Sequence, residues 1–373
     1  MAEAFPRRRF LKAAGAASLA SFFPGRLRAE ESAELLTVDP WIRRQADEAP
    51  LAMRFRGTTA QECRAWQAEF AAKLRALLGP HAPPDRWKTV VQEAKDLEDH
   101  RREQLLLLAE GHPPLPVYLL LPRPQPNKRC AGILAIHGHG EFGYHTVAGR
   151  DDLPGVAKAI QGANYDYGRQ LVRRGYVVAV PCLNPFGPRL GRTATGDKTD
   201  RCADTFIRLQ MLGKLLIAEN LRDCLWALEL LARHQEVDAG RLGCVGLSYG
   251  GRMTMLTTAL EPRIGVAVVS GALNVMQERI SKPYSCGAQI IPGLLNYGDT
   301  PEIGSLIAPR PCLWEVGLHD GLISPQWADE ALTRMRRAYQ ALGAEDRLLV
   351  DRFEGRHQWH GEVAYPLLAK ILG

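Results

Sequence analysis

Apolar and polar positions alternate with a helical period in the first part of the chain. From residue 30 to about residue 99, apolar side chains recur every three or four residues, which predicts amphipathic helices. Thr59 and Glu62 have the spacing of a capping box at a helix start, and Gly79 with the proline after it ends the pattern. The apolar positions of this predicted helix are Trp66, Phe70, Leu74, Leu77 and Leu78. We therefore expect residues 30–99 to form an N-terminal helical extension that packs on the main domain and carries no chemistry.

After residue 100 the pattern changes to short apolar runs separated by amphipathic stretches. The runs that predict strands are 104–109, 117–121, 131–136, 176–181, 241–247, 264–270, 311–316 and 347–353. The stretches that predict helices are 167–174, 215–234, 249–260 and 327–342. Strands that alternate with helices imply crossover connections and a sheet covered on both faces. The predicted fold class is α/β, with a mostly parallel central sheet flanked by helices in a domain spanning residues 100–373.

The positive charge of the chain is concentrated at its start. The formal net charge is +6, but residues 1–29 contain six Lys and Arg residues against Glu3, so the remainder carries only +1. Nucleic-acid binding needs a cluster of uncompensated bases, and the body of the chain offers none. We therefore expect no nucleic-acid partner.

The first 29 residues have the layout of an export signal. A basic start is followed by a short apolar stretch over residues 13–23 and by Leu27-Arg28-Ala29, a small-residue cleavage pattern. The segment Arg7-Arg8-Arg9-Phe10-Leu11-Lys12 resembles the twin-arginine translocation motif. The apolar stretch is shorter than the roughly 20 residues that cross a bilayer. We expect a signal peptide at residues 1–29, the twin-arginine translocase as partner during export, a periplasmic or secreted location, and no stable membrane insertion.

The chain contains eight cysteines and no C-x-x-C pair. Such a count suggests disulfides in a small secreted domain, but this chain is large, and several of its cysteines lie within apolar runs where cysteine acts as a small hydrophobe. A twin-arginine substrate also crosses the membrane already folded, so its thiols can be buried while they are still in the reducing cytoplasm. We expect mostly free, buried thiols.

The segment Gly246-Leu247-Ser248-Tyr249-Gly250-Gly251 joins a predicted strand to a predicted helix. In a G-x-S-x-G elbow the serine occupies a strained strand-to-helix turn, and the glycines keep side chains away from its hydroxyl group. A serine hydroxyl needs a base to become a nucleophile, and the base needs an acid to orient it. Ser248 is the predicted nucleophile.

The acid and the base are expected after later strands, in the order serine, acid, histidine. Asp320 follows the run 311–316, and His357 follows the run that ends at Phe353. Both lie just past the carboxyl end of a strand, where open α/β sheets place their ligands. Glu315 is a rival acid, but it lies inside an apolar run. His360 is a rival base, but it lies three residues farther from the strand end than His357. Asp320 and His357 are therefore the preferred assignments.

The attack on a carbonyl also needs two donors for the developing oxyanion. The backbone N–H of Tyr249 supplies one, and we assign the other to the N–H of His139 in the loop His137-Gly138-His139-Gly140. The alternative for this loop is a metal site built from His137, His139 and His145. No carboxylate-and-histidine set at metalloenzyme spacing accompanies these histidines, so we expect no metal.

These segments together resemble the α/β-hydrolase superfamily from about residue 100 to the end, and more narrowly its dienelactone-hydrolase-like and acetyl xylan esterase-like branch. The residues that carry the closer resemblance are the loop 137–140, the elbow, Gly187 within Asn184-Pro185-Phe186-Gly187-Pro188-Arg189, the segment Ile307-Ala308-Pro309-Arg310-Pro311, and Gly317-Leu318-His319-Asp320. Dienelactone hydrolases use a cysteine nucleophile, whereas this chain has Ser248, which favours ordinary ester hydrolysis. The resemblance implies a triad of Ser248, Asp320 and His357 without a metal or organic cofactor, and an acetylated glycan as the leading substrate.

Two other functions remain open. The elbow is equally similar to that of prolyl-oligopeptidase-like serine peptidases, although too few residues precede the first strand to form a propeller. A non-catalytic relative that binds glycan fragments is the second alternative. Phe186 and Trp359 are candidate substrate-stacking residues, and packing within the fold is the alternative role of both. Arg252 lies either in the cleft or in a surface ion pair. The long segment over residues 273–308 is expected to form a wall of the pocket.

Overall fold

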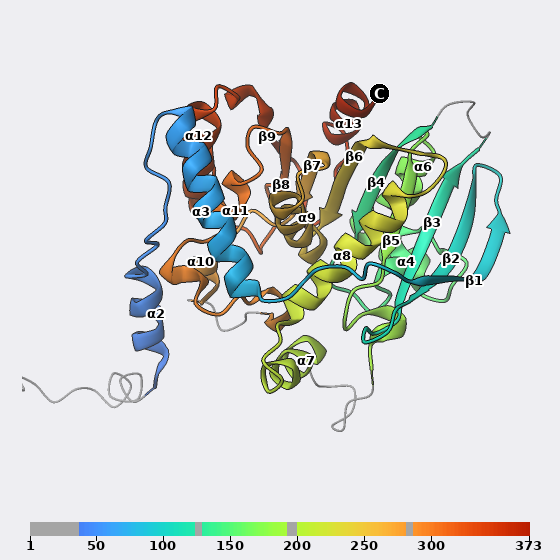
Figure 1. Cartoon of the computed structure of the whole chain (residues 1–373), viewed down its shortest axis with the longest axis horizontal. Coiled ribbons are helices and arrows are strands. Elements are labelled where there is room, and N and C mark those ends of the chain that lie inside the picture. The colour runs from blue at the N-terminus through green and yellow to red at the C-terminus, as the bar shows by residue number, and fades with distance from the viewer. Residues whose placement is uncertain (1–36, 124–128, 192–199, 281–285) are drawn as a thin grey trace, which may run out of the picture.

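A nine-stranded sheet forms the centre of the computed structural model, which describes residues 37–123, 129–191, 200–280 and 286–373. The strand order across the sheet is β1-β2-β3-β5-β4-β6-β7-β8-β9 (Figure 1). The strands are β1 (Lys88–Asp96), β2 (His100–Leu108), β3 (Leu115–Pro122), β4 (Cys130–Ile136), β5 (Val177–Pro181), β6 (Val237–Leu247), β7 (Ile264–Ser270), β8 (Cys312–Gly317) and β9 (Leu348–Phe353).

The sheet is antiparallel at one side and parallel over the rest. The pairings of β1 with β2, β2 with β3 and β3 with β5 are antiparallel. The five pairings from β5 through β4, β6, β7 and β8 to β9 are parallel. Four of the parallel strands, β4, β5, β7 and β8, have no exposed position, as expected for strands covered on both faces. The predicted α/β fold with a mostly parallel sheet is confirmed.

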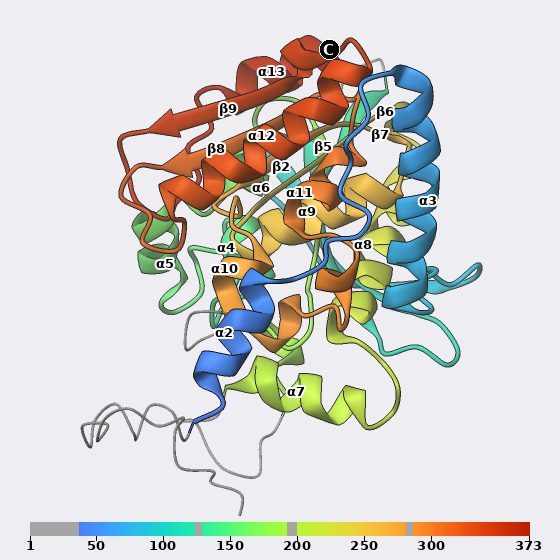
Figure 2. The same ribbon diagram turned by 90° about the vertical axis from the view of Figure 1, so that its left-hand side faces the viewer.

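Helices cover both faces of the sheet (Figures 1 and 2). The longer helices are α2 (Asp39–Asp47), α3 (Ala60–Leu78), α5 (Val156–Ala163), α7 (Arg201–Gln210), α8 (Leu216–Ala232), α9 (Tyr249–Leu260), α12 (Pro325–Ala341) and α13 (Ala364–Leu372). The shorter ones are α4 (Tyr144–Val147), α6 (Tyr167–Val172), α10 (Met276–Ile280) and α11 (Thr300–Ser305). One hydrophobic core joins the sheet to α3, α8, α9, α11 and α12, and the other joins it to α4, α6 and α13.

The N-terminal part is helical only in its first half. Helix α3 begins at the predicted capping box, in which the hydroxyl of Thr59 accepts from the N–H of Glu62 and the Glu62 carboxylate accepts from the N–H of Thr59. The prediction of helix up to residue 99 was wrong, because residues 88–96 form β1 and extend the sheet. This edge strand is polar and largely exposed, so it lacks the alternation of apolar residues that reveals a half-buried strand.

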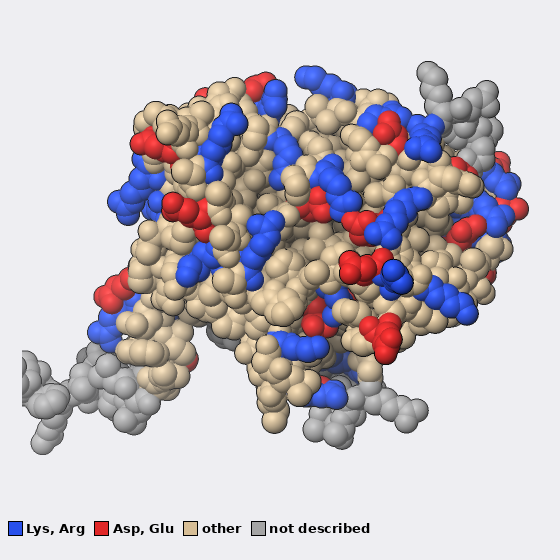
Figure 3. Space-filling view, in the orientation of Figure 1, with Lys and Arg blue, Asp and Glu red and all other residues tan. Residues whose placement is uncertain are grey.

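All eight cysteines are free and buried, as expected. Among the helices of the described segments, none combines the length and the apolar character needed to span a bilayer. The predicted signal peptide at residues 1–29 lies outside the described residues. Lysine and arginine are interspersed with aspartate and glutamate on the face drawn in Figure 3, so this face carries no patch of a single charge.

Candidate active site

The turn between β6 and α9 holds Ser248 in a strained conformation. Its φ of 64° and ψ of −122° lie in a region that residues other than glycine rarely adopt. The glycines around it are required by close packing: a Cβ on Gly250 would lie 1.9 Å from the carbonyl oxygen of Ile136, and one on Gly246 would lie 2.5 Å from the backbone of Gly250. The start of α9 therefore packs against the end of β4 at a distance that only glycine permits.

Asp320 and His357 meet beyond the carboxyl ends of the last two strands. The Nδ1 atom of His357 lies 2.7 Å from Oδ2 of Asp320, while Oδ1 of Asp320 accepts from the N–H of Leu322 at 2.9 Å. Asp320 is 5% exposed, so its charge is largely shielded from water. The Nε2 atom of His357 is buried and has no hydrogen-bond partner among the described residues. One nitrogen of the imidazole is thus fixed by a carboxylate and the other is available.

Ser248 and His357 line one cavity of about 610 Å³. This volume is in the range of small-molecule sites, which is about 300 to 1,000 Å³. The elbow and the loop after β4 line part of the wall, and the segment 273–308 lines another part, as predicted. The lining residues from that segment are Asn274, Arg279, Cys286 and Gln289. Apolar side chains from residues 142, 159, 163, 165, 247 and 322 complete much of the wall.

The rival acid and the rival base are both engaged elsewhere. Glu315 is fully buried, and its carboxylate accepts from the N–H of Gly361 at 2.8 Å and from the N–H of His360 at 3.3 Å. Burial raises the pKa of Glu315 above its ordinary value. The Nδ1 atom of His360 lies 2.6 Å from Oδ2 of Asp351. Neither Glu315 nor His360 lines the cavity, so this second group of polar residues anchors the loop after β9.

The loop after β4 is held by tyrosines from the following segment. The N–H of Gly138 donates to the hydroxyl of Tyr165 at 2.8 Å, and the hydroxyl of Tyr167 donates to the carbonyl of Ile136 at 2.5 Å. His139, the next residue, lines the cavity together with Tyr249. Because Tyr249 is the first residue of α9, its N–H has no carbonyl four residues earlier within the helix. The two amides assigned to the oxyanion therefore belong to residues on the wall beside Ser248.

The three histidines of the alternative metal site do not gather around one point. His137 is fully buried, its Nε2 accepts from the N–H of Leu183 at 2.9 Å, and its Nδ1 lies 2.8 Å from the carbonyl of Gly138. His145 instead pairs with the hydroxyl of Tyr118 at 3.0 Å. Among the described residues, neither group of side chains close enough to share a metal includes His137 or His145. His137 therefore links the loop after β4 to the loop after β5.

The buried imidazole of His137 makes the stability of the fold depend on pH. Burial lowers its pKa from 6.5 to about 4. The unfolded chain takes up this proton as the pH falls below about 6.5, whereas the folded chain does so only near pH 4. The stabilisation is therefore present above pH 6.5 and is lost as the pH falls toward 4.

We expect the free energy of unfolding in urea to fall by about 2 kcal/mol between pH 7 and pH 5 because of this one group. In the His137→Gln variant, whose amide oxygen can still accept from Leu183, that part of the decrease should disappear. An equal decrease in the variant and the unmodified chain would contradict this interpretation of the histidine.

Of the two candidate stacking residues, neither lines the cavity. Trp359 was wrongly predicted to contact substrate, because it is fully buried, stacks on Tyr167, and donates from Nε1 to the hydroxyl of Tyr365. Phe186 is 5% exposed and packs its ring against the rings of His137, His139 and Tyr249. Phe186 thus supports the cavity wall from behind.

Arg252 lies in the cavity wall and not in a surface ion pair. It is buried, and it donates to Gln289 at 3.0 Å, to Thr300 at 2.7 Å and to Asn274. Burial lowers its pKa to about 10, so it remains a cation at neutral pH.

The wall segment and Cys286 within it were predicted, but sequence reasoning did not single out Arg279 and Gln289 as members of the wall. Arg279 lies in the five-residue helix α10 and Gln289 in a 3₁₀ helix of three residues, which are too short for a periodic pattern to show which side chains face the cavity.

Comparison with solved structures identifies the fold. The family models that were compared gave no match. A "putative acetyl xylan esterase" from Bacteroides fragilis NCTC 9343 has a TM-score of 0.74 at 18% identity, over 93% of this chain and 97% of that one. A glucuronoyl esterase from Solibacter usitatus has a TM-score of 0.59 at 15% identity, over 84% of this chain and 93% of that one. At these identities the likeness shows that the fold is that of the α/β-hydrolases.

A relative found by sequence comparison shows the family of the chain. This chain is 30% identical over 301 residues to "Putative hydrolase YtaP" of Bacillus subtilis (strain 168), and the match covers 78% of this chain and 94% of that protein. The chain has the α/β-hydrolase fold and belongs to the same family as this Bacillus protein.

Proposed function

We propose that the chain is a serine carboxylic-ester hydrolase that acts through an acyl-enzyme on a small or carbohydrate-linked ester. The observation that carries the proposal is the state of His357, which lines the cavity together with Ser248: its Nδ1 is held at 2.7 Å by the Asp320 carboxylate, and its Nε2 has no hydrogen-bond partner among the described residues. An imidazole with one orienting carboxylate and one available nitrogen is arranged to act as a general base.

In the proposed reaction, Nε2 of His357 takes the proton of the Ser248 hydroxyl as Oγ attacks the ester carbonyl. Asp320 accepts from Nδ1–H, which selects the tautomer with a basic Nε2 and stabilises the imidazolium ion. The proton then passes to the leaving alcohol, and water hydrolyses the acyl group on Ser248 with the same histidine as base. In apo structures the serine–histidine hydrogen bond is often long and tightens only with substrate, so the unpaired Nε2 is compatible with this role.

The backbone N–H groups of Tyr249 and His139 are the proposed donors to the oxyanion. The hydroxyl of Tyr165 already accepts from the N–H of Gly138, which supports His139 as the donor from this loop. A single donor of this kind contributes about 3 to 4 kcal/mol to transition-state stabilisation.

The cavity wall favours an ester of a polar alcohol, for which an acetylated glycan is the leading candidate. Arg252 and Arg279 bring two guanidinium groups to the wall, and Asn274 and Gln289 add amides. Arg252 already donates to Gln289, Thr300 and Asn274, so Arg279 is the guanidinium group from which sugar hydroxyl groups can accept. The two similar solved structures, an acetyl xylan esterase and a glucuronoyl esterase, support the same substrate class. We also propose twin-arginine export to the periplasm or outside the cell, where such substrates occur.

A matched pair of acetate esters tests the preference for the alcohol. We expect kcat/KM for acetylated xylo-oligosaccharides to exceed that for hexyl acetate by at least about 10-fold, because one hydrogen bond to a charged group contributes about 1.5 to 3 kcal/mol. The acyl group is the same in both, so the ratio reports the alcohol alone. In the Arg279→Leu variant the ratio should fall while the rate with hexyl acetate is retained.

A wider panel separates this proposal from its competitors. Methyl uronates, longer acyl esters and peptide amides are added to the same assay. Preference for peptide amides would replace the esterase by a serine peptidase. Binding of glycans without turnover of any ester, including p-nitrophenyl acetate, would indicate a non-catalytic binder.

A further inference from the structure

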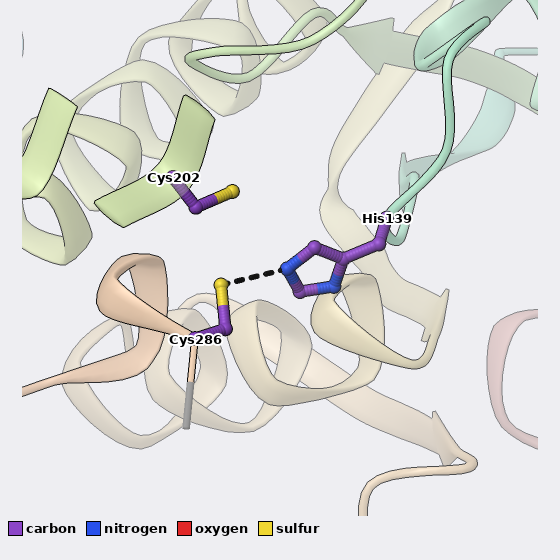
Figure 4. Close-up of side chains that lie close together, drawn as sticks. All are labelled: His139, Cys202 and Cys286. Carbon is purple, nitrogen blue, oxygen red and sulfur yellow. Dashed lines mark hydrogen bonds between the residues drawn. The ribbon is translucent and has the colours of Figure 1, made fainter. Parts of the chain in front are cut away.

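Three metal-ligating side chains, His139, Cys202 and Cys286, lie close together (Figure 4). His139 comes from the loop after β4, Cys202 from the first turn of α7, and Cys286 from the residue before the short 3₁₀ helix Gly287–Gln289. Their ligand atoms all lie within 4.8 Å of one another, and Nε2 of His139 lies 2.9 Å from Sγ of Cys286. Cys286 and His139 also line the cavity.

The backbone brings the two cysteines together by a close approach of their segments. A Cβ on Gly287 would lie 2.7 Å from Cβ of Phe206 and 3.0 Å from the carbonyl oxygen of Cys202. Both contacts are with α7, so only a residue without a side chain lets the turn after Cys286 reach that helix. The meeting of the sulfur atoms is therefore a consequence of backbone packing.

The surroundings of the sulfur atoms suit metal binding. Both cysteines are buried, and Nε2 of His139 contacts Sγ of Cys286, so one imidazole and two thiols face the same small space. A bound metal displaces the thiol protons, so both sulfur atoms would bind as thiolates. Cys202 also lies in the first turn of a helix, where the helix dipole favours negative charge.

We propose that His139, Cys202 and Cys286 form a zinc-binding site whose fourth coordination position opens toward the cavity. Two thiolates and one imidazole are a donor set that zinc prefers. Around a tetrahedral zinc ion with Zn–S bonds of about 2.3 Å, two sulfur atoms lie about 3.8 Å apart. The observed group has this scale, so small side-chain rotations suffice to form the site. Three protein ligands leave one position for water or a substrate oxygen.

Zinc at this position would inhibit the proposed esterase. It would bind the imidazole of the residue whose backbone N–H is assigned to the oxyanion, and it would place a hydrated cation in the cavity beside Ser248. The inhibition rests on the proposed function, whereas zinc binding does not. Oxidation of the two thiols to a disulfide, with loss of two electrons to an added oxidant, is the competing fate of the same sulfur atoms.

Cobalt(II) serves as the probe of the site. The full chain is first reduced with a phosphine and freed of metal by a chelator, and cobalt(II) is then added. We expect thiolate-to-cobalt charge-transfer absorption with tetrahedral visible bands that saturate at one cobalt ion per chain. Zinc should displace the cobalt ion and compete with a chromophoric chelator. Cys202→Ser and Cys286→Ser should each weaken zinc binding by at least about 100-fold, since even outer-shell partners of metal sites change affinity about 10- to 100-fold.

Cys130→Ser is the matched control. It removes another buried thiol, at the start of β4 and away from the cavity, and should leave metal binding unchanged. If a site variant fails to fold, zinc protection of Cys202 and Cys286 from alkylation in the unmodified chain supplies the same information. The ratio of esterase rates without and with zinc, taken within each variant, should fall toward one in Cys202→Ser.

Three results would overturn the zinc site. The first is cobalt absorption without a thiolate band, and the second is zinc affinity unchanged in both cysteine variants. The third is a reduced chain that takes up no metal but forms a Cys202–Cys286 disulfide with a mild oxidant, which would assign the pair to redox chemistry. If zinc binds and the esterase is absent, the site stands and the proposed function fails.

Discussion

Replacement of Ser248 by alanine is expected to lower kcat for p-nitrophenyl acetate by about a million-fold, the loss seen when a triad nucleophile is removed. In the proposed acyl-enzyme, the acyl group is bonded to the protein only through Oγ of Ser248. Removal of the hydroxyl group should change the free energy of unfolding little, because the strain at position 248 lies in the backbone φ of 64° and is the same for serine and alanine. The measurement is single-turnover and steady-state hydrolysis together with urea unfolding of the same preparations.

Ser305→Ala is the matched control for this prediction. Ser305 lies in α11, is buried, and donates to the carbonyl of Pro301 at 2.7 Å without lining the cavity. Its loss should reduce the free energy of unfolding by about 1 kcal/mol and leave the rate close to that of the unmodified chain. Retention of most activity in Ser248→Ala would reject Ser248 as the nucleophile.

Asp320→Asn is expected to lower kcat by about 10⁴-fold, since an amide in this position no longer selects the productive tautomer of the histidine. The side chains have the same shape, so the 2.7 Å contact with His357 can persist while its chemistry changes. KM should change far less than kcat. The measurement is the separate determination of kcat and KM with p-nitrophenyl acetate.

A second carboxylate–imidazole pair, whose histidine lies in the same loop after β9, provides the control. Asp351 lies 2.6 Å from Nδ1 of His360, nearly the same geometry as in the Asp320–His357 pair. Because His360 does not line the cavity, Asp351→Asn should lower kcat by less than about 10-fold. A larger loss from Asp351→Asn than from Asp320→Asn would exchange the roles of the two pairs.

Where a residue type has a local physical cause, the sequence predicted the structure closely. The run 264–270 became β7 without a shift, and the stretch 249–260 became α9. The elbow could be predicted because close packing allows only glycine at certain positions in it. A Cβ on Gly250, for example, would lie 1.9 Å from the carbonyl oxygen of Ile136. Asp320 and His357 follow strands of the parallel sheet, so topology alone brings them to one edge.

The remaining features depend on contacts that sequence spacing does not reveal. His139 and Cys286 are 147 residues apart, and their contact depends on the path of the wall segment. Trp359 was misassigned as a stacking residue because sequence position does not show which way an aromatic ring points, and this ring fills the core against Tyr167. The strand β1 was missed because an exposed edge strand needs few apolar residues.

The central claim is that Ser248 carries the acyl group during turnover. Mass spectrometry of peptides from the enzyme, acid-quenched during turnover of p-nitrophenyl acetate, tests it most directly. The account predicts one acetyl group on Ser248, present during turnover and gone once the substrate is exhausted. Acetyl on Cys286 or His139 with Ser248 unmodified, followed by release at the rate of turnover, would contradict it.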